Sequence, residues 1–252
     1  MKTTLFAATL VVALSLSAAA AQKPPVSQHL AGANEAGSPP TMVPPALCDP
    51  CLFYGGDLSP SNPNAAGLSS EDTLLISGSA TYGNFVVPSS QSVLVSGILF
   101  NIQADANFDP LTASYDVRQG ISEGDGGTDL ETGTANIAVA ATGRNFLGLN
   151  EYSVAVQLAT PLTLGPGAYW FSVTPECLNG ATDGSCSVGR FFVSNVTGRT
   201  DSIHGSGEPG GQMYFNSAYF GFTFADWCDS SLGLNAHQCN SLSFGLLGNV
   251  IP

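Results

Sequence analysis

The sequence predicts an all-β fold, a single antiparallel β-sandwich of jelly-roll type with about ten strands and disulfide-stapled loops. Three observations predict it. Short segments alternate apolar and polar residues with a period of two, as half-buried strands do. The 29 glycines and 16 prolines punctuate most of the chain, and no apolar repeat typical of a helix is present. Strands at that spacing are typical of sandwiches and barrels rather than of βαβ units.

The clearest alternation lies in residues 151–158, where apolar side chains take the even positions from Tyr152 to Leu158. Residues 168–174 and 114–118 follow the same pattern. One face of each segment is therefore expected in the core. The other candidate strands are residues 74–77, 82–87, 92–102, 135–141, 190–194, 213–224 and 241–247.

The candidate strand at residues 92–102 changes phase at Gly97. Val95 precedes the glycine and Ile98 follows it, so a regular strand would place these two side chains on opposite faces. A β-bulge at Gly97 would return both halves of the strand to one face. We therefore expect a bulge there.

The first 21 residues predict a signal peptide. Lys2 gives a positive start, residues 5–16 form an apolar run, and three alanines at residues 19–21 suit cleavage before Gln22. Because the run is shorter than the about 20 residues that span a membrane, we expect no membrane insertion. We expect a secreted, extracellular protein, and a periplasmic or cell-surface location is an open alternative.

Residues 22–47 contain three Pro-Pro pairs among Ala, Gly and Ser. Such a composition cannot bury a core and favours extended chain. We expect a disordered Pro-rich linker here, followed by one β-sandwich domain over residues 48–252. Roughly 200 residues is within the size of one all-β domain.

The chain is strongly acidic, with 6 Lys and Arg against 19 Asp and Glu and a formal charge of −13. Removal of the signal peptide takes away Lys2 and leaves 5 basic residues against 19 acidic ones, a charge of −14. Nucleic acids and anionic membranes are excluded as partners, because both need clustered Lys and Arg. The charge favours a soluble monomer and is compatible with cation binding.

The six cysteines of an exported chain predict three disulfides. Six cysteines allow 15 connectivities, but their spacing favours local couples: Cys48 with Cys51, Cys177 with Cys186, and Cys228 with Cys239. The first couple has the spacing of a thiol redox motif. That chemistry needs a helix N-terminus that the sequence does not predict, so we expect a structural bridge.

Three phrases carry a resemblance: GISEGDGGT at residues 120–128, LGPGAYWFSV at 164–173 and YFNSAYFG at 214–221. They resemble phrases of a broad group of uncharacterised bacterial secreted β-sandwich proteins, over about residues 73–247. These motifs consist of turn residues and core residues, so the resemblance implies the fold. It implies no catalytic residues, because the group has none assigned.

One acidic segment suggests a structural calcium ion. Asp105, Asn107 and Asp109, with Asp116 further on, match the oxygen-ligand spacing of a calcium loop. Pro110 stands where a calcium hand needs glycine, and strands flank the segment instead of helices. A calcium loop between strands and an ordinary Asx-rich turn are both open. The same alternatives hold for the acidic loop of Glu123, Asp125 and Asp129.

Two tryptophans are candidate binding residues. Trp170 alternates with Tyr169 and Phe171, so it is either exposed or buried beneath a loop, and Trp227 follows a later strand. Exposed tryptophans on a sandwich stack on sugar rings, whereas buried ones would seal a second hydrophobic cluster.

Two functional classes follow. The first is a non-catalytic extracellular module that binds a glycan, a matrix polymer or a protein partner, or that has a structural role. The second is a secreted polysaccharide hydrolase that uses paired carboxylates. The first is favoured because no nucleophile motif surrounds the three histidines, and the local signals serve folding.

Overall fold

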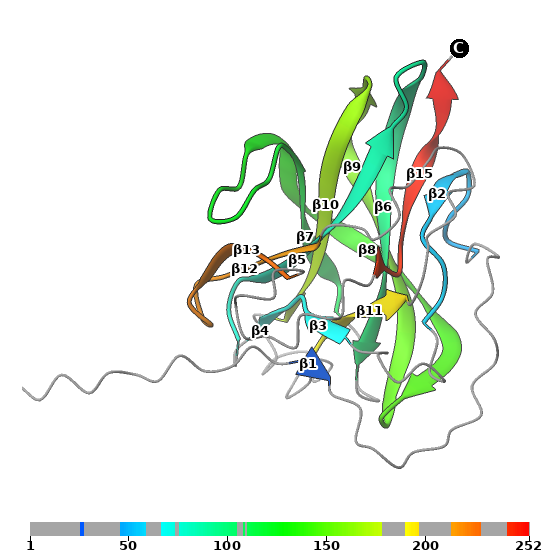
Figure 1. Cartoon of the computed structure of the whole chain (residues 1–252). Helices are drawn as coiled ribbons and strands as arrows, with labels where there is room; N and C mark the ends of the chain where they lie inside the picture. Colours follow the sequence, from blue (N-terminus) through cyan, green and yellow to red (C-terminus); the bar gives the residue numbers. More distant parts are fainter. Residues whose placement is uncertain are drawn as a thin grey trace, which may run out of the picture.

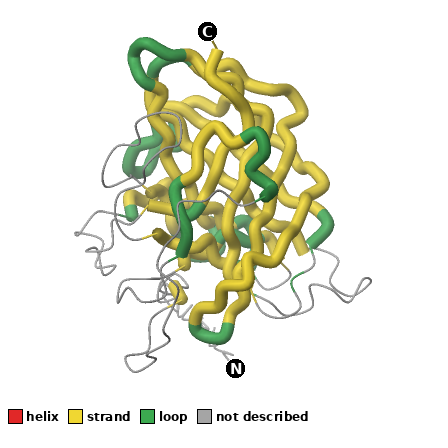
Figure 2. Tube along the Cα trace, turned by 90° about the vertical axis from the view of Figure 1, so that its right-hand side faces the viewer, coloured by secondary structure: helices red, strands yellow, loops and turns green. Residues whose placement is uncertain are grey.

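The computed structural model describes residues 46–58, 67–73, 76–104, 108, 110–177, 190–196, 213–227 and 241–251, and the backbone of residues 26–27. These residues are mostly extended, and Figure 2 shows no helix among them. The predicted all-β class is confirmed. The described strands are β1 (Val26–Ser27), β2 (Cys51–Tyr54), β3 (Gly67–Ser69), β4 (Asp72–Thr73), β5 (Ser79–Val87), β6 (Ser92–Ala104), β7 (Thr112–Gln119), β8 (Thr128–Phe146), β9 (Leu149–Leu164), β10 (Gly167–Cys177), β11 (Phe192–Val196), β12 (Met213–Ser217), β13 (Phe222–Asp226), β14 (Ser241–Leu242) and β15 (Phe244–Ile251).

The strands form a hydrogen-bonded sheet in the order β1-β3-β11-β6-β9-β8-β7-β10-β5-β12-β13. β15 pairs with β6 and with β2, so it lies between them (Figure 1). β14 pairs with β11. Neighbours are antiparallel except β4 and β10, which run parallel. The described strands number fifteen rather than about ten, since several are short pieces that alternation alone does not reveal.

Strand β8 joins the two halves of the sheet. Its residues 128–136 pair with β7, whereas residues 137–146 pair with β9. Apolar side chains from both halves meet in one core: the rings of Phe171 on β10 and Phe244 on β15 lie 6.4 Å apart. Strands β10 and β15 therefore contribute side chains to the same core.

The predicted bulge at Gly97 is confirmed. The register of β6 against β9 shifts between Val95 and Gly97, and the register of β15 against β6 shifts at the same place. Val95 and Ile98 consequently both lie in the main core. A Cβ at Gly97 would lie 2.6 Å from the carbonyl oxygen of Val156, so the bulged strand approaches β9 too closely for a side chain.

The predicted strand at residues 213–224 is wrong as a single strand. It is the hairpin β12–β13, because a turn at residues 218–221 interrupts it and Gly221 takes a φ of 75°. Phe215 and Phe222 both pack on the main core across this turn.

The N-terminal predictions fall mostly outside the described residues. This holds for the signal peptide at residues 1–21 and for most of the linker at residues 22–47, of which Val26–Ser27 pairs with β3. Among the described residues, no helix is long and apolar enough to cross a membrane.

Candidate functional site

A second apolar cluster lies apart from the main core, and we call it the Trp170 cluster. It consists of Tyr82, Ile121, Trp170 and Tyr214, with Phe224 packed against it. Strand alternation explains its position, because Tyr169 and Phe171 belong to the main core and the side chain between them faces the other way. Trp170 is only 5% exposed, and its ring meets that of Tyr214 edge-on at 6.0 Å.

A polar bridge crosses the same face. The Tyr82 hydroxyl on β5 donates to Asp116 Oδ2 on β7 at 2.7 Å, although β10 lies between these strands. Ser172 of β10 stands opposite Asp116, and its small side chain leaves room for the phenol to reach across. Arg118 Nε donates to the same carboxylate oxygen at 2.5 Å, and Arg118 also lies 3.7 Å from Asp129.

Burial raises the pKa of both bridge partners, Tyr82 and Asp116. Desolvation raises the pKa of the Asp116 carboxyl above its ordinary value, although the hydrogen bonds from Arg118 and Tyr82 act to lower it. Desolvation, and then the nearby negative charge of Asp116, raises the pKa of the Tyr82 phenol far above its ordinary value. The phenol therefore stays protonated at physiological pH and can act as the donor.

Three buried polar atoms of this region have no hydrogen-bond partner within the described structure: Asp116 Oδ1, Ser172 Oγ and the indole Nε1 of Trp170. Buried polar atoms are usually hydrogen-bonded, since leaving one unpaired costs about 1 to 3 kcal/mol. These three atoms come from residues that neighbour one another on β7 and β10. They give the Trp170 cluster unused capacity to donate and accept hydrogen bonds.

The loop of residues 120–127 and strand β13 meet beside this face. Gly124 N donates to the carbonyl oxygen of Phe224 at 3.2 Å, and Asp226 N donates to the Glu123 carboxylate. The Phe224 ring lies 5.2 Å from the Arg118 guanidinium and 5.5 Å from the Tyr82 ring. A Cβ at Gly126 would lie 2.5 Å from the Phe224 ring, so a side chain there would require the ring to move.

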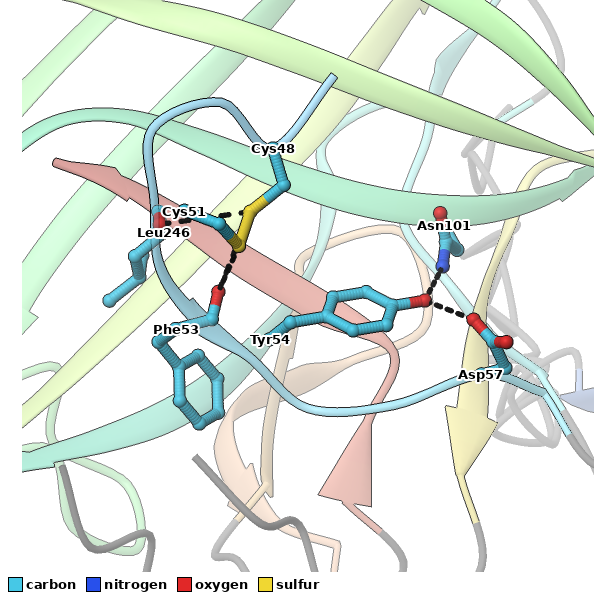
Figure 3. Close-up of a disulfide and its surroundings, with 7 residues drawn as sticks. All are labelled: Cys48, Cys51, Phe53, Tyr54, Asp57, Asn101 and Leu246. Carbon is cyan, nitrogen blue, oxygen red and sulfur yellow. Dashed lines mark hydrogen bonds between the residues drawn. A yellow bond between two sulfur atoms is a disulfide. The ribbon is translucent and has the colours of Figure 1, made fainter. Parts of the chain in front are cut away.

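A second polar network attaches residues 46–58 to the sheet (Figure 3). The Tyr54 hydroxyl donates to Asp57 and accepts from Asn101 Nδ2 at 2.9 Å. Burial, and then the charge of Asp57, raises the pKa of Tyr54. Arg144 lies 3.1 Å from Asp57 and also pairs with Glu151.

The carboxylates of this second network are occupied by structural contacts. Glu151, with its side chain fully buried, accepts hydrogen bonds from Ser194 at 2.6 Å and Thr142 at 2.8 Å besides its pairing with Arg144. Hydrogen bonds between a carboxylate and a charged or hydroxyl donor are among the stronger ones in proteins. The network therefore anchors residues 46–58 to the sheet.

The structure does not bring the two candidate tryptophans together. Trp227 is 7% exposed and lies in the main core, where its ring meets those of Phe215 and Phe222 at 5.5 and 6.3 Å. Trp170 lies in its separate cluster. Both rings are buried in this conformation, so neither presents an open face.

The predicted bridge between Cys48 and Cys51 is confirmed. Cys177 is also disulfide-bonded. Cys186, Cys228 and Cys239 lie outside the described residues, and the pairings of Cys177 with Cys186 and of Cys228 with Cys239 stay predictions.

The candidate calcium ligands Asp105, Asn107 and Asp109 lie outside the described residues. Over the part of the chain that the structure describes, no group of three or more His, Cys, Asp or Glu is arranged to hold a metal ion. In the other acidic loop, Asp125 accepts a hydrogen bond from Gly127 N at 3.0 Å, a turn contact.

The bridge of Tyr82, Asp116 and Arg118 was missed by the sequence analysis. The signal was present in part, because Asp116 and Arg118 are two residues apart in an alternating strand and therefore share a face. Nothing in the sequence shows that Tyr82 lies two strands away from them.

Comparison of the chain with known protein families, with curated proteins and with solved structures finds no match in any of the three.

Proposed function

We propose that the chain is a secreted, non-catalytic β-sandwich module that binds an extracellular glycan. The observation that carries this proposal is the Trp170 cluster. In it, aromatic rings gather outside the main core beside three polar atoms that have no partner in the described part of the chain. Aromatic rings with a few directed polar groups are the usual means of binding a sugar, which has apolar faces and a rim of hydroxyls.

We also propose that this all-β fold is a sandwich of jelly-roll type. Two observations support it: apolar rings from β10 and β15 share one core, and β8 passes from one half of the sheet to the other. A strand that changes sheets at a bend is a known way of closing a sandwich.

A polysaccharide hydrolase is the second candidate, and one observation favours it. The pKa of Asp116 is raised, as it is for catalytic acids, and Asp129 is a second carboxylate nearby. Both carboxylates, however, pair with Arg118. A glycosidase needs its two carboxylates on either side of the scissile bond, and a shared arginine holds these two toward itself.

The test is retention of the mature wild-type protein on immobilised neutral and anionic polysaccharides. We expect retention on a neutral polymer, and weaker retention for Trp170→Phe, which keeps a ring but loses the indole N–H. Tyr219→Phe is the matched control, since Tyr219 is 47% exposed and lies outside the cluster. Release of reducing sugar by the wild type would favour the hydrolase, and retention on no polymer would contradict the binding role.

We also propose that Asp105, Asn107 and Asp109 bind a structural calcium ion that stabilises the folded protein. Calcium should raise the Tm of the mature protein, since a ligand that binds only the folded state stabilises it. Asp105→Asn with Asp109→Asn should remove the response. A Tm unchanged by calcium and by chelator would contradict this part of the proposal.

A further inference from the structure

Phe224 occupies an unusual position in β13. Residues two apart on a strand normally face the same side of the sheet, and Phe222 packs on the main core. Phe224 instead packs on the Trp170 cluster. The register of β12 against β13 shifts here, so that β13 has one extra residue between Phe222 and Ala225. Phe224 lies in this irregular stretch with a left-handed φ of 40°.

This backbone conformation is costly for an aromatic residue. Non-glycine residues with positive φ are uncommon, and bulky ones are outliers that the surrounding structure must enforce. Such strain collects at ligand clamps and switch regions. Here the conformation places the Phe224 ring against the Tyr82 ring at 5.5 Å and under the Arg118 guanidinium at 5.2 Å.

Phe224 packs on the cluster that contains Trp170. Its ring contacts Tyr82 and Arg118, the two residues that hydrogen-bond Asp116. The polar groups of this region suit a polar ligand better than phenylalanine. Asp116 Oδ1 accepts hydrogen bonds, Trp170 Nε1 donates them and Ser172 Oγ does both, yet none of the three has a partner among the residues that the structure describes. A phenyl ring offers no hydrogen bond to any of them. A sugar ring presents an apolar face together with hydroxyls that donate and accept.

We infer that Phe224 is a plug that occupies, in the closed state, the place of a sugar ring in a subsite formed by Trp170, Tyr82, Asp116 and Ser172. This inference rests on the proposed glycan-binding function and adds the site, its gate and its ligand class. Withdrawal of Phe224 exposes the subsite, and the sugar hydroxyls then satisfy the unpaired atoms.

Charge determines the class of sugar. The chain carries 19 acidic and 6 basic residues, and the one arginine of the site is already paired with Asp116 and Asp129. A sulfated or uronic-acid polymer would meet net repulsion and no free cation. The ligand is therefore a neutral glycan.

Few contacts hold the plug in place. Phe224 is linked to the loop of residues 120–127 by the hydrogen bond between Gly124 N and the Phe224 carbonyl, and the neighbouring Asp226 N bonds Glu123. Gly120, Gly124 and Gly127 all have positive φ, so the loop is built on residues that permit backbone movement. Opening breaks these two hydrogen bonds and the contacts of the ring with Arg118 and Tyr82, none of which belongs to the main core.

The test compares wild type with Phe224→Gly in the full mature chain. Glycine accepts the left-handed φ, so this variant removes the ring without adding strain. Phe222→Ala is the matched control, because it removes a ring from the same strand but from the main core. The probes are neutral glucose, mannose and galactose hexasaccharides and one uronic-acid hexasaccharide, titrated by calorimetry.

We expect Phe224→Gly to bind one neutral hexasaccharide at least tenfold more tightly than wild type, with no gain for the uronic-acid probe or for Phe222→Ala. Adding Asp116→Asn or Ser172→Ala to Phe224→Gly should cancel most of the gain. In a Trp227→Phe background, where Trp170 is the remaining tryptophan, Phe224→Gly should also increase acrylamide quenching at least twofold.

Two outcomes would overturn the plug. One is equal binding by wild type and Phe224→Gly while wild type is still retained on a polysaccharide, which leaves the glycan function standing at another site. The other is an equal gain for Phe222→Ala, which would assign the effect to general loosening of the hairpin. Failure of the proposed function has a different signature, because then neither wild type nor any variant binds a glycan.

Discussion

The Tyr82 hydroxyl and the Asp116 carboxylate are joined by a 2.7 Å hydrogen bond that spans strand β10. The bond connects β5 to β7, the two neighbours of β10. Ser172 of β10 stands opposite Asp116, so the bond crosses β10 near Ser172. It holds the Asp116 side chain on the face where the Trp170 cluster lies.

Tyr82→Phe should lower the free energy of unfolding by about 1.5 kcal/mol, the lower range for a hydrogen bond to a charged group, because the bridge is partly exposed. It should also raise the pKa of Asp116 further, since one stabilising donor is lost. Chemical denaturation and NMR titration measure the two effects. Tyr219→Phe is the control, as its side chain is exposed, and an equal loss there would contradict the assignment.

The raised pKa of Asp116 predicts a pH dependence. The native state binds this proton more tightly than the unfolded state, whose carboxyl keeps the ordinary pKa of 3.8. The contribution of Asp116 to stability is therefore greatest below pH 3.8 and falls as the pH rises through the raised pKa. The Asp116→Asn variant has no titrating group at this position, so its free energy of unfolding should not show this fall with pH. Unfolding free energies of the two proteins at several pH values should diverge in that direction, and a constant difference would contradict it.

Arg144→Ala should be strongly destabilising, by about 3 to 5 kcal/mol, because it leaves the buried Glu151 without its cation. Adding Glu151→Gln should recover part of the loss. Arg118→Ala provides the comparison, since its partner Asp116 is partly exposed and the loss should be smaller. Denaturant unfolding measures all three, and equal losses for the two arginines would contradict the role of burial.

Gly97→Ala should destabilise the protein by about 1 to 3 kcal/mol, the range for overpacking, because the new Cβ would lie 2.6 Å from the Val156 carbonyl. Gly165→Ala is matched to it, since a Cβ at Gly165 meets nothing within 4 Å. Thermal unfolding should separate the two variants. Similar Tm values would show that the bulge tolerates a side chain.

Peptide mapping without reduction should join Cys177 to Cys186 and Cys228 to Cys239, with no free thiol in the mature protein. Replacing Cys177 and Cys186 together by serine should cost about 3 kcal/mol, the loop-entropy value for a bridge of ten residues. A fragment that joins Cys177 to Cys228 or Cys239 would contradict the local pairing.

Alternation along single strands was the reliable part of the sequence analysis. It placed Val154 and Phe171 in the core and located the bulge at Gly97, because these properties depend on neighbours within one strand. The first half of β8 was missed because the method depends on alternation within a strand, and residues 128–134 are mostly polar on both faces. A strand with little buried surface carries no period-two signal.

The candidate site was predictable only in part. The sequence showed that Trp170 faces away from Tyr169 and Phe171, but what covers it depends on a hairpin about fifty residues later and on the left-handed φ of Phe224. The pairing of Arg144 with Asp57 joins distant segments. Such contacts follow from tertiary structure, to which local pattern gives no access.

The position of β15 between β2 and β6 affects when the protein can fold. Ser243, just before this strand, donates to the Gly56 carbonyl from 187 residues away. Until residues 244–251 have been synthesised, β2 lacks its described partner and β6 lacks one of its partners. Closing so long a loop costs entropy before any contact compensates it, and folding rates fall accordingly. A nascent chain that lacks residues 244–251 therefore cannot complete this part of the sheet. Truncation before residue 241 should leave a species that aggregates through its open edges.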